Sequence, residues 1–290
     1  MQGYGILLKH EEFIKEIELP KEFIMSKNKK KKKGSIIGRI LWWIVLLISL
    51  GVFLFAAYQL LSIHFEYKAS VDEYDDLKQF AATAPAGSDI GDVGDVSDEV
   101  EVEPGPQIDF AALKEVNEDV VGWLYVEALE DINYPIVQGK DNDYYLHRTF
   151  KQTYNFAGSI FLESTNKSDF SDPHNIVFGH NMKNGSMFGK LKDFRDPEVF
   201  AKSRYFWICT PRKNYKYEIF SVQEVLSGGD AYLLFSAPGT EMIEYGEKMQ
   251  SQSEVETPEV NFTMDSRIAT LSTCTTNTVN RLIVQGVQVN

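Results

Sequence analysis

Ile268–Cys274 reads IATLSTC, and four polar residues, 275–278, follow it. β-branched and apolar residues dominate this run, so it is predicted to form a strand that ends at the cysteine. A side chain at the end of a strand is held rigidly and stays accessible, which suits a nucleophile. The alternative is a small buried core residue, because free cysteine is among the most buried residue types.

Two other predicted strand ends carry residues that could act with this cysteine. The apolar run Asn175–Gly179 ends in His180, and the glycine together with the polar Asn181 suggests a turn that presents the ring. Arg281 begins the last apolar run of the chain. Taken singly, the histidine reads more simply as a structural residue and the arginine as a surface charge.

Taken together, the three residue types have a shared chemical logic. A thiol has an ordinary pKa of about 8.5 and an imidazole one of about 6.5, so a catalytic pair must be held in, or shifted toward, its thiolate–imidazolium form. The imidazolium can protonate a leaving amine, and the neutral ring can deprotonate an incoming one. Arginine can stabilise an oxyanion or hold a substrate backbone. We predict Cys274 as nucleophile, His180 as acid/base and Arg281 as the stabilising charge, with no metal and no cofactor.

The region from Ile108 onward is rich in predicted strands. Eight short runs within fewer than 200 residues are apolar or alternating, which favours a closed barrel or a sandwich with a mainly β fold. Helical spacing between turn residues predicts short helical inserts. The predicted strands are 121–126, 132–138, 157–163, 175–179, 205–210, 216–225, 267–273 and 282–289, and the predicted helices are 109–119, 142–149, 187–194, 197–203 and 241–252.

The N-terminal part predicts a membrane anchor. No charged residue occurs from Ile40 to Ile63, and at ~1.5 Å per residue a helix of that length spans roughly 36 Å, enough for a bilayer core. A cleaved signal peptide is the alternative, although its apolar part is usually only ~7–15 residues long. Lysines precede the run and acidic residues follow it, so the positive-inside rule places the N-terminus in the cytoplasm.

The expected organisation follows from these patterns. It comprises a cytoplasmic segment 1–35 that starts at Met1 or Met25, a transmembrane helix 36–63, an extracellular spacer 64–107 and a catalytic domain 108–290. Proline, glycine and acidic residues in 81–107 are typical of a solvated linker. The net charge of −13 argues against a nucleic-acid binder, because phosphate recognition needs a basic surface.

Other reactive residues fit less well. Cys209 lies in an aromatic run and is expected in the core, although an exported domain permits a disulfide between it and Cys274. His174 follows Asp-Pro and is expected in a turn, and His147 is expected to flank a short helix. Asp141, Asn142 and Asp143 only weakly suggest a calcium site, because an EF-hand loop has a different spacing.

Several strings in this chain resemble the signatures of a known family. TLSTC at 270–274, Arg281 at the start of the next strand and GHNM at 179–182 resemble the catalytic motifs of sortases. Four further strings resemble class B sortases in particular: NYPIVQG at 133–139, DNDYYL at 141–146, AGSIFL at 157–162 and GSMFG at 185–189. The resemblance runs from about Ile108 to the end. One departure is the absence of an acidic residue between Cys274 and Arg281, where some class B members have one, so loop-dependent selectivity is not carried over.

The resemblance implies a fold and a function. It implies an eight-stranded sortase barrel that cleaves a C-terminal sorting signal of surface proteins after Thr, forms a thioester and transfers the acyl group to a peptidoglycan amine. The residues that match the class B substrate groove are Asn142, Leu146, Phe178 and Ser272. Two alternatives stay open from sequence: an anchored, non-catalytic binding or scaffold domain, and a cysteine protease that releases its product to water.

Overall fold

The computed structural model describes residues 36–82, 105–274 and 279–290. The chain divides into two compact units, Met1–Tyr58 and Gln59–Asn290. The expected cytoplasmic segment 1–35 with its two candidate starts, residues 83–104 of the expected spacer, and the polar residues 275–278 lie outside the described residues.

Helix α1 (Ile36–Leu77) contains the predicted membrane-spanning run. Its side chains from Ile36 to Phe65 include many large apolar groups that are about half or more exposed. By length and composition this helix is able to cross a membrane.

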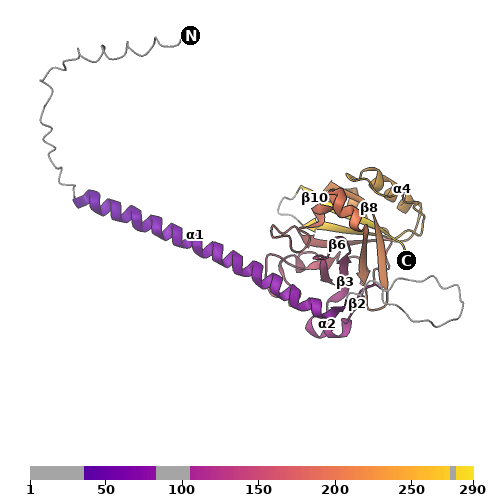
Figure 1. The fold of residues 1–290 in the computed structure, drawn as a ribbon, viewed down its shortest axis with the longest axis horizontal. Helices are drawn as coiled ribbons and strands as arrows, with labels where there is room; N and C mark the ends of the chain where they lie inside the picture. Colours follow the sequence, from indigo (N-terminus) through magenta and orange to yellow (C-terminus); the bar gives the residue numbers. More distant parts are fainter. Residues whose placement is uncertain (1–35, 83–104, 275–278) are drawn as a thin grey trace, which may run out of the picture. The chain divides into compact units, whose positions relative to one another are not determined.

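Gln59–Asn290 contains a closed barrel of eight strands (Figure 1). The strand order around the barrel is β10-β8-β7-β3-β4-β5-β6-β9, with parallel pairing between β4 and β5 and between β6 and β9. The predicted mainly β fold is confirmed. Of the two architectures that the sequence favoured, a closed barrel and a sandwich, the structure has the closed barrel. The strands are β3 (Val120–Val126), β4 (Asn133–Val137), β5 (Ile160–Leu162), β6 (His174–His180), β7 (Tyr205–Cys209), β8 (Asn214–Leu226), β9 (Ile268–Cys274) and β10 (Asn280–Gln288).

Short helices fill the connections near the predicted positions. Asp109 and Asp196 are the N-cap residues of α2 and α3, because each side chain accepts a hydrogen bond from a backbone N–H in the first turn of its helix. The helices are α2 (Phe110–Val116), η2 (Tyr145–His147), η3 (Leu191–Arg195), α3 (Pro197–Lys202), η4 (Asp230–Tyr232) and α4 (Thr240–Ser251).

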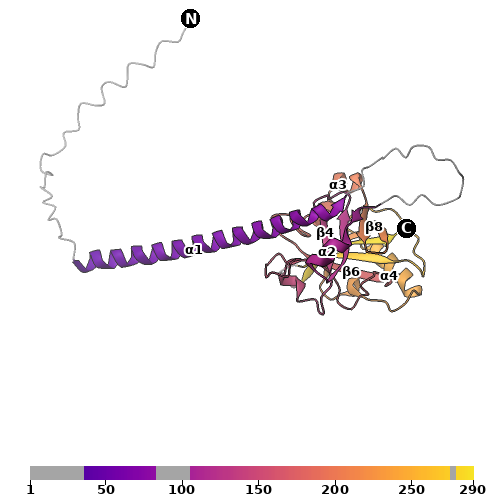
Figure 2. The same cartoon turned by 90° about the horizontal axis from the view of Figure 1, so that it is seen from below.

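Helix α4 covers the outer side of the barrel over β8, β9 and β10 (Figures 1 and 2). Met242, Tyr245 and Met249 of this helix are buried, and they pack in one cluster with Phe262 and with residues of the three strands. The strand side chains on this face are therefore enclosed, although they lie outside the barrel lumen. This second layer has consequences for the site, because β9 carries Cys274.

The compact unit begins before the boundary expected at Ile108. Tyr74 and Leu77 of α1 are only 3% and 2% exposed, and the Tyr74 hydroxyl donates to the Gly158 carbonyl at 2.9 Å. Strand β1 (Ala81–Ala82) also pairs with β2 (Gln107–Ile108). The part of the expected spacer before residue 83 therefore belongs to the folded unit, because a few apolar positions in a charged helix are enough to attach it.

Candidate active site

Two strands far apart in sequence bring His180 and Cys274 together. Strands β6 and β9 pair in parallel, with His174 opposite Ile268 at one end and His180 opposite Cys274 at the other. Parallel strands end at the same edge of a sheet, so the ends of the two motifs meet. This pairing depends on tertiary structure, so the sequence of neither motif indicates it.

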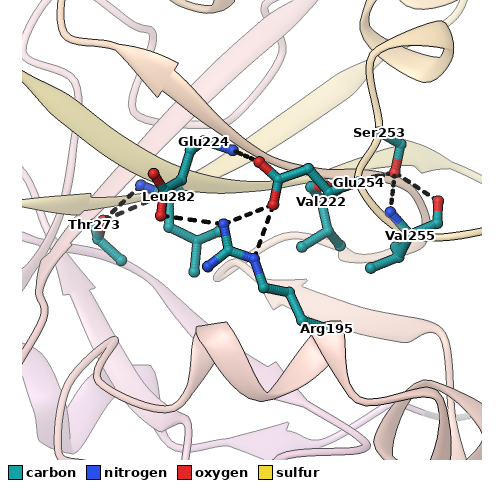
Figure 3. Close-up of polar contacts among 8 residues, drawn as sticks. All are labelled: Arg195, Val222, Glu224, Ser253, Glu254, Val255, Thr273 and Leu282. Atoms are coloured by element: carbon teal, nitrogen blue, oxygen red, sulfur yellow. Dashed lines mark hydrogen bonds and ion pairs between the residues drawn. The ribbon is translucent and has the colours of Figure 1, made fainter.

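Strand β10 places Arg281 on the other side of β9. The antiparallel pairing of β10 with β9 ends where Ile283 lies opposite Ser272, two residues after Arg281 and two residues before Cys274. The Thr273 hydroxyl extends the pairing: it accepts from the Leu282 amide at 3.0 Å and donates to the Leu282 carbonyl at 3.2 Å (Figure 3). Cys274 therefore lies on a strand between one that carries His180 and one that carries Arg281.

The end of β6 is shaped to present His180. A Cβ on Gly179 would lie 2.4 Å from Ile160 Cδ1 and 2.8 Å from the Phe188 ring, so the close packing there requires glycine. The Phe188 amide donates to the His180 carbonyl at 2.9 Å, which folds the following loop back onto the strand.

The ring of His180 has a defined hydrogen-bond partner. Its Nε2 lies 2.6 Å from the carbonyl oxygen of Leu146. A carbonyl only accepts, so Nε2 carries a proton, and Nδ1 is the nitrogen that gains or loses one. The His147 ring stacks against His180 with centroids 6.0 Å apart.

His180 and Arg281 line one hollow of about 380 Å³, which we call the groove. It combines aromatic and apolar walls with a few polar groups, as ligand-binding sites commonly do. The lining residues are Asn142, Leu146, His147, Phe161, Phe178, His180, Ser227, Gly228, Tyr232 and Arg281.

Three of the four residues matched to the class B substrate groove line it: Asn142, Leu146 and Phe178. The Asn142 amide is fixed by donating to Glu163 Oε2 at 2.6 Å and accepting from the Ser164 amide at 2.9 Å. Ser272 differs, because it is fully buried. Its hydroxyl lies 2.8 Å from that of Tyr232, so it meets the groove through that tyrosine.

The groove also contains residues that the sequence analysis did not assign to the site. Tyr232 and Ser227 come from the connection after β8, where glycines and acidic residues give no periodic signal. His147 was expected only to flank a helix, and it is the last residue of η2. The neighbouring resemblance string 141–146 was the one available indication that this segment reaches the site.

An ion-pair cluster ties the loop elements around the site to the barrel (Figure 3). Arg195 of η3 contacts Glu254 Oε2 at 2.7 Å and Glu224 Oε1 at 3.2 Å. The Glu224 amide also donates to Glu254 at 2.8 Å. These side chains are 36–49% exposed, so each pair adds little stability. Glu224 is the register partner of Leu282, which places the cluster next to the Arg281 strand.

Cys209 is a free thiol at the opposite end of the barrel. It is fully buried and pairs with Asn214 at the start of the 13-residue strand β8, whereas Val225 near the end of that strand pairs with Arg281. Burial raises the pKa of its thiol to about 12. The permitted disulfide with Cys274 is therefore not formed, and Cys209 is a core residue.

Asp141 has a structural use in place of metal binding. Its carboxylate accepts the amides of Asp143 and Tyr144, which closes the turn before η2. Across the parts of the chain that the structure describes, no three His, Cys, Asp or Glu side chains converge as a metal site would require.

His174 is not the turn residue expected from its Asp-Pro context. It is the first residue of β6 and is fully buried. Burial lowers its pKa to about 4, since desolvation disfavours the charged ring, so His174 is neutral at pH 7. It lies at the end of β6 opposite His180 and is not the base.

A closed barrel that brings cysteine, histidine and arginine to one edge is the frame of a cysteine-dependent acyl-transfer enzyme. The sortase domain model matches residues 124–289. Sortase B of Listeria monocytogenes is 36% identical over 245 residues, covering 83% of this chain and 93% of that protein. The crystal structure of Bacillus anthracis sortase B in complex with AAEK1 is 31% identical with a TM-score of 0.63, covering 78% of this chain and 99% of that one.

A Staphylococcus aureus sortase B–substrate complex is 26% identical with a TM-score of 0.58, covering 62% of this chain and 84% of that one. The chain therefore belongs to the sortase family of cysteine transpeptidases, in its class B branch. The resemblance seen in the motifs is confirmed, and with it the eight-stranded sortase barrel.

The buried state of His174 predicts a measurable pH dependence. The unfolded chain binds a proton at this ring near pH 6.5 and the folded chain only near pH 4, so stability falls as the pH drops through that window. Between pH 7.5 and pH 5 the parent should lose about 2 kcal/mol of unfolding free energy more than His174→Gln loses. Urea unfolding at both pH values measures this, and equal losses would contradict a buried neutral histidine.

Proposed function

We propose that this chain cleaves a C-terminal sorting signal of surface proteins after Thr and transfers the new acyl end to a peptidoglycan amine. The observation that carries the proposal is the pairing of His180 with Cys274 beside a groove that His180 and Arg281 line. Family membership supplies the reaction class, and the barrel supplies a fixed frame for the three residues.

The first half-reaction forms a thioester. The Cys274 thiolate attacks the threonine carbonyl, and an oxyanion develops that Arg281 stabilises with its fixed N–H donors. The carbon–nitrogen bond then breaks, and the imidazolium of His180 gives its Nδ1 proton to the leaving amine. The Leu146 carbonyl keeps the ring oriented by accepting a hydrogen bond from the Nε2–H group throughout.

The second half-reaction returns the enzyme to its starting state. The acceptor amine attacks the thioester carbon, neutral His180 takes the proton, and the Cys274 thiolate leaves. The groove residues Asn142, Leu146 and Phe178 bind the sorting signal in this scheme, and buried Ser272 acts on it through Tyr232. The enzyme uses no metal and no cofactor.

The proposed location is the outer face of the cell membrane, with α1 as a single-pass type II anchor in the lipid bilayer. Support comes from the lysines at 29–33 before the apolar run and from acidic residues after it.

The reaction is tested by incubating the full-length protein with a peptide library and an amine acceptor, and identifying joined products by mass spectrometry. Joined products are expected with the parent and none with Cys274→Ala. The matched control Cys209→Ala should keep activity and lose about 1 kcal/mol or more of stability through a small cavity. Water-terminated products alone would indicate a protease, and no cleavage of any peptide would favour a scaffold.

Two substitutions of Arg281 separate the contribution of its charge from that of its shape. Arg281→Lys keeps the charge and loses the planar donor fork, whereas Arg281→Met loses both. We expect partial activity for lysine and a roughly 100- to 1000-fold loss in kcat for methionine, as for removal of one oxyanion donor. Steady-state kinetics measure both, and a methionine variant near the parent rate would leave Arg281 as a surface charge.

Membrane orientation is tested with intact protoplasts. Added protease should remove the barrel domain, while an N-terminal tag before the lysine run stays protected. Digestion of the tag with the barrel intact would reverse the orientation and exclude a cell-wall substrate.

A further inference from the structure

A buried hydrogen-bond network lies behind the groove on the same side of the barrel as α4. It consists of Gln285 of β10, Thr270 of β9, His174 of β6 and Tyr245 of α4, and we call these four residues the relay. Three of them are fully buried and Tyr245 is 5% exposed. None of the four lines the groove, so the proposed reaction leaves the relay without a role.

The relay has a direction, because each donor can be assigned. The Gln285 amide Nε2 lies 2.7 Å from the Tyr245 hydroxyl and 2.9 Å from Thr270 Oγ1, so its two N–H groups supply one bond to each. Each hydroxyl is then left with its own proton to donate.

Both branches end on carbonyl groups of one loop. The Tyr245 hydroxyl donates to the Ala231 carbonyl at 3.0 Å. Thr270 Oγ1 lies 2.7 Å from His174 Nε2, and His174 Nδ1 lies 2.6 Å from the Leu233 carbonyl. Since that carbonyl only accepts, Nδ1 carries the proton and Nε2 accepts from Thr270.

The two carbonyls flank Tyr232, the residue that this loop contributes to the groove. The Tyr232 ring stacks on Phe178 with centroids 6.3 Å apart, and its hydroxyl lies 2.8 Å from Ser272 Oγ. Its backbone lies in the short helix η4 and just after it, where the Tyr232 and Leu233 amides donate to the local carbonyls of Gly229 and Asp230. The relay therefore fixes the loop to the barrel on both sides of the groove residue.

We propose that the relay positions Tyr232 as a wall of the peptide groove, which makes His174, Thr270, Tyr245 and Gln285 positioning residues for substrate binding. The proposal rests on the proposed function in that the groove receives the peptide. The relay acts through Tyr232 and touches neither the peptide nor the reacting atoms. Its loss therefore weakens peptide binding more than it slows the chemical step.

The test uses conservative changes with a matched control. Tyr245→Phe removes the hydroxyl that reaches Ala231, and Thr270→Val removes the link to His174 while keeping the side-chain shape. Tyr217→Phe makes the same change at a buried tyrosine of β8 whose hydroxyl has no hydrogen-bond partner among the described residues. Each is measured in the full-length protein with a peptide that the parent cleaves.

We expect KM to rise about fivefold in Tyr245→Phe and in Thr270→Val, the factor that corresponds to one hydrogen bond, with kcat within about twofold. Tyr217→Phe should match the parent. In a Tyr232→Ala background, Tyr245→Phe should add no further rise in KM, because the wall it positions is already absent. If the relay had a purely structural role, the variants would have a lower melting temperature and an unchanged KM, and that result would overturn the proposal. The proposal would also be overturned if the effects of Tyr245→Phe and Tyr232→Ala on KM were fully additive.

Hydrogen exchange separates this proposal from the proposed reaction. Amides of residues 227–235 should exchange about fivefold faster in Tyr245→Phe than in Tyr217→Phe, whether or not any peptide is cleaved. If Tyr245→Phe exchanges faster but the parent cleaves no peptide, the proposed reaction is refuted, whereas the inference that the relay anchors the loop is retained. An active parent whose variant shows neither faster exchange nor a raised KM would refute the relay and keep the reaction.

Discussion

The parallel pairing of β6 with β9 is the constraint on which the rest of the structure depends. Parallel neighbours end at one edge of a sheet, so the pairing that begins with His174 opposite Ile268 must finish with His180 opposite Cys274. A slip of one residue would exchange the faces of every side chain on β9, because the side-chain period of a strand is two. The register therefore sets both the candidate catalytic pair and the layer beneath it.

Parallel strands need a long connection, and here that connection builds the surroundings of the site. Between His180 and Ile268 the chain forms η3, α3, two barrel strands, the Tyr232 loop and α4. Helix α4 encloses the outer side of β9, so Thr270 and Ser272 are buried. Arg195 joins the start of this connection to β8, and the relay joins its later part to β6, β9 and β10.

The sequence predicted the strands and α4 well, because β-branched runs and turn residues are local signals. The register is not local, so the pairing of His180 with Cys274 along the sheet could be inferred only through the family resemblance. His174 was misplaced because Asp-Pro is a turn signal that tertiary burial overrode. Tyr232 was missed because its loop has no periodicity. Burial of Tyr74 was not expected, because only this residue and a few neighbours of a charged helix are buried.

The most direct test of the account locates the acyl intermediate. The full-length protein is mixed with a cleavable peptide without acceptor amine, quenched in acid, digested and mapped by mass spectrometry. The account predicts an acyl thioester on the fragment that contains Cys274, which added amine removes to give the joined product, and none on the fragment with Cys209. Acylation of Cys209, or cleavage with no acyl group on Cys274, would contradict it.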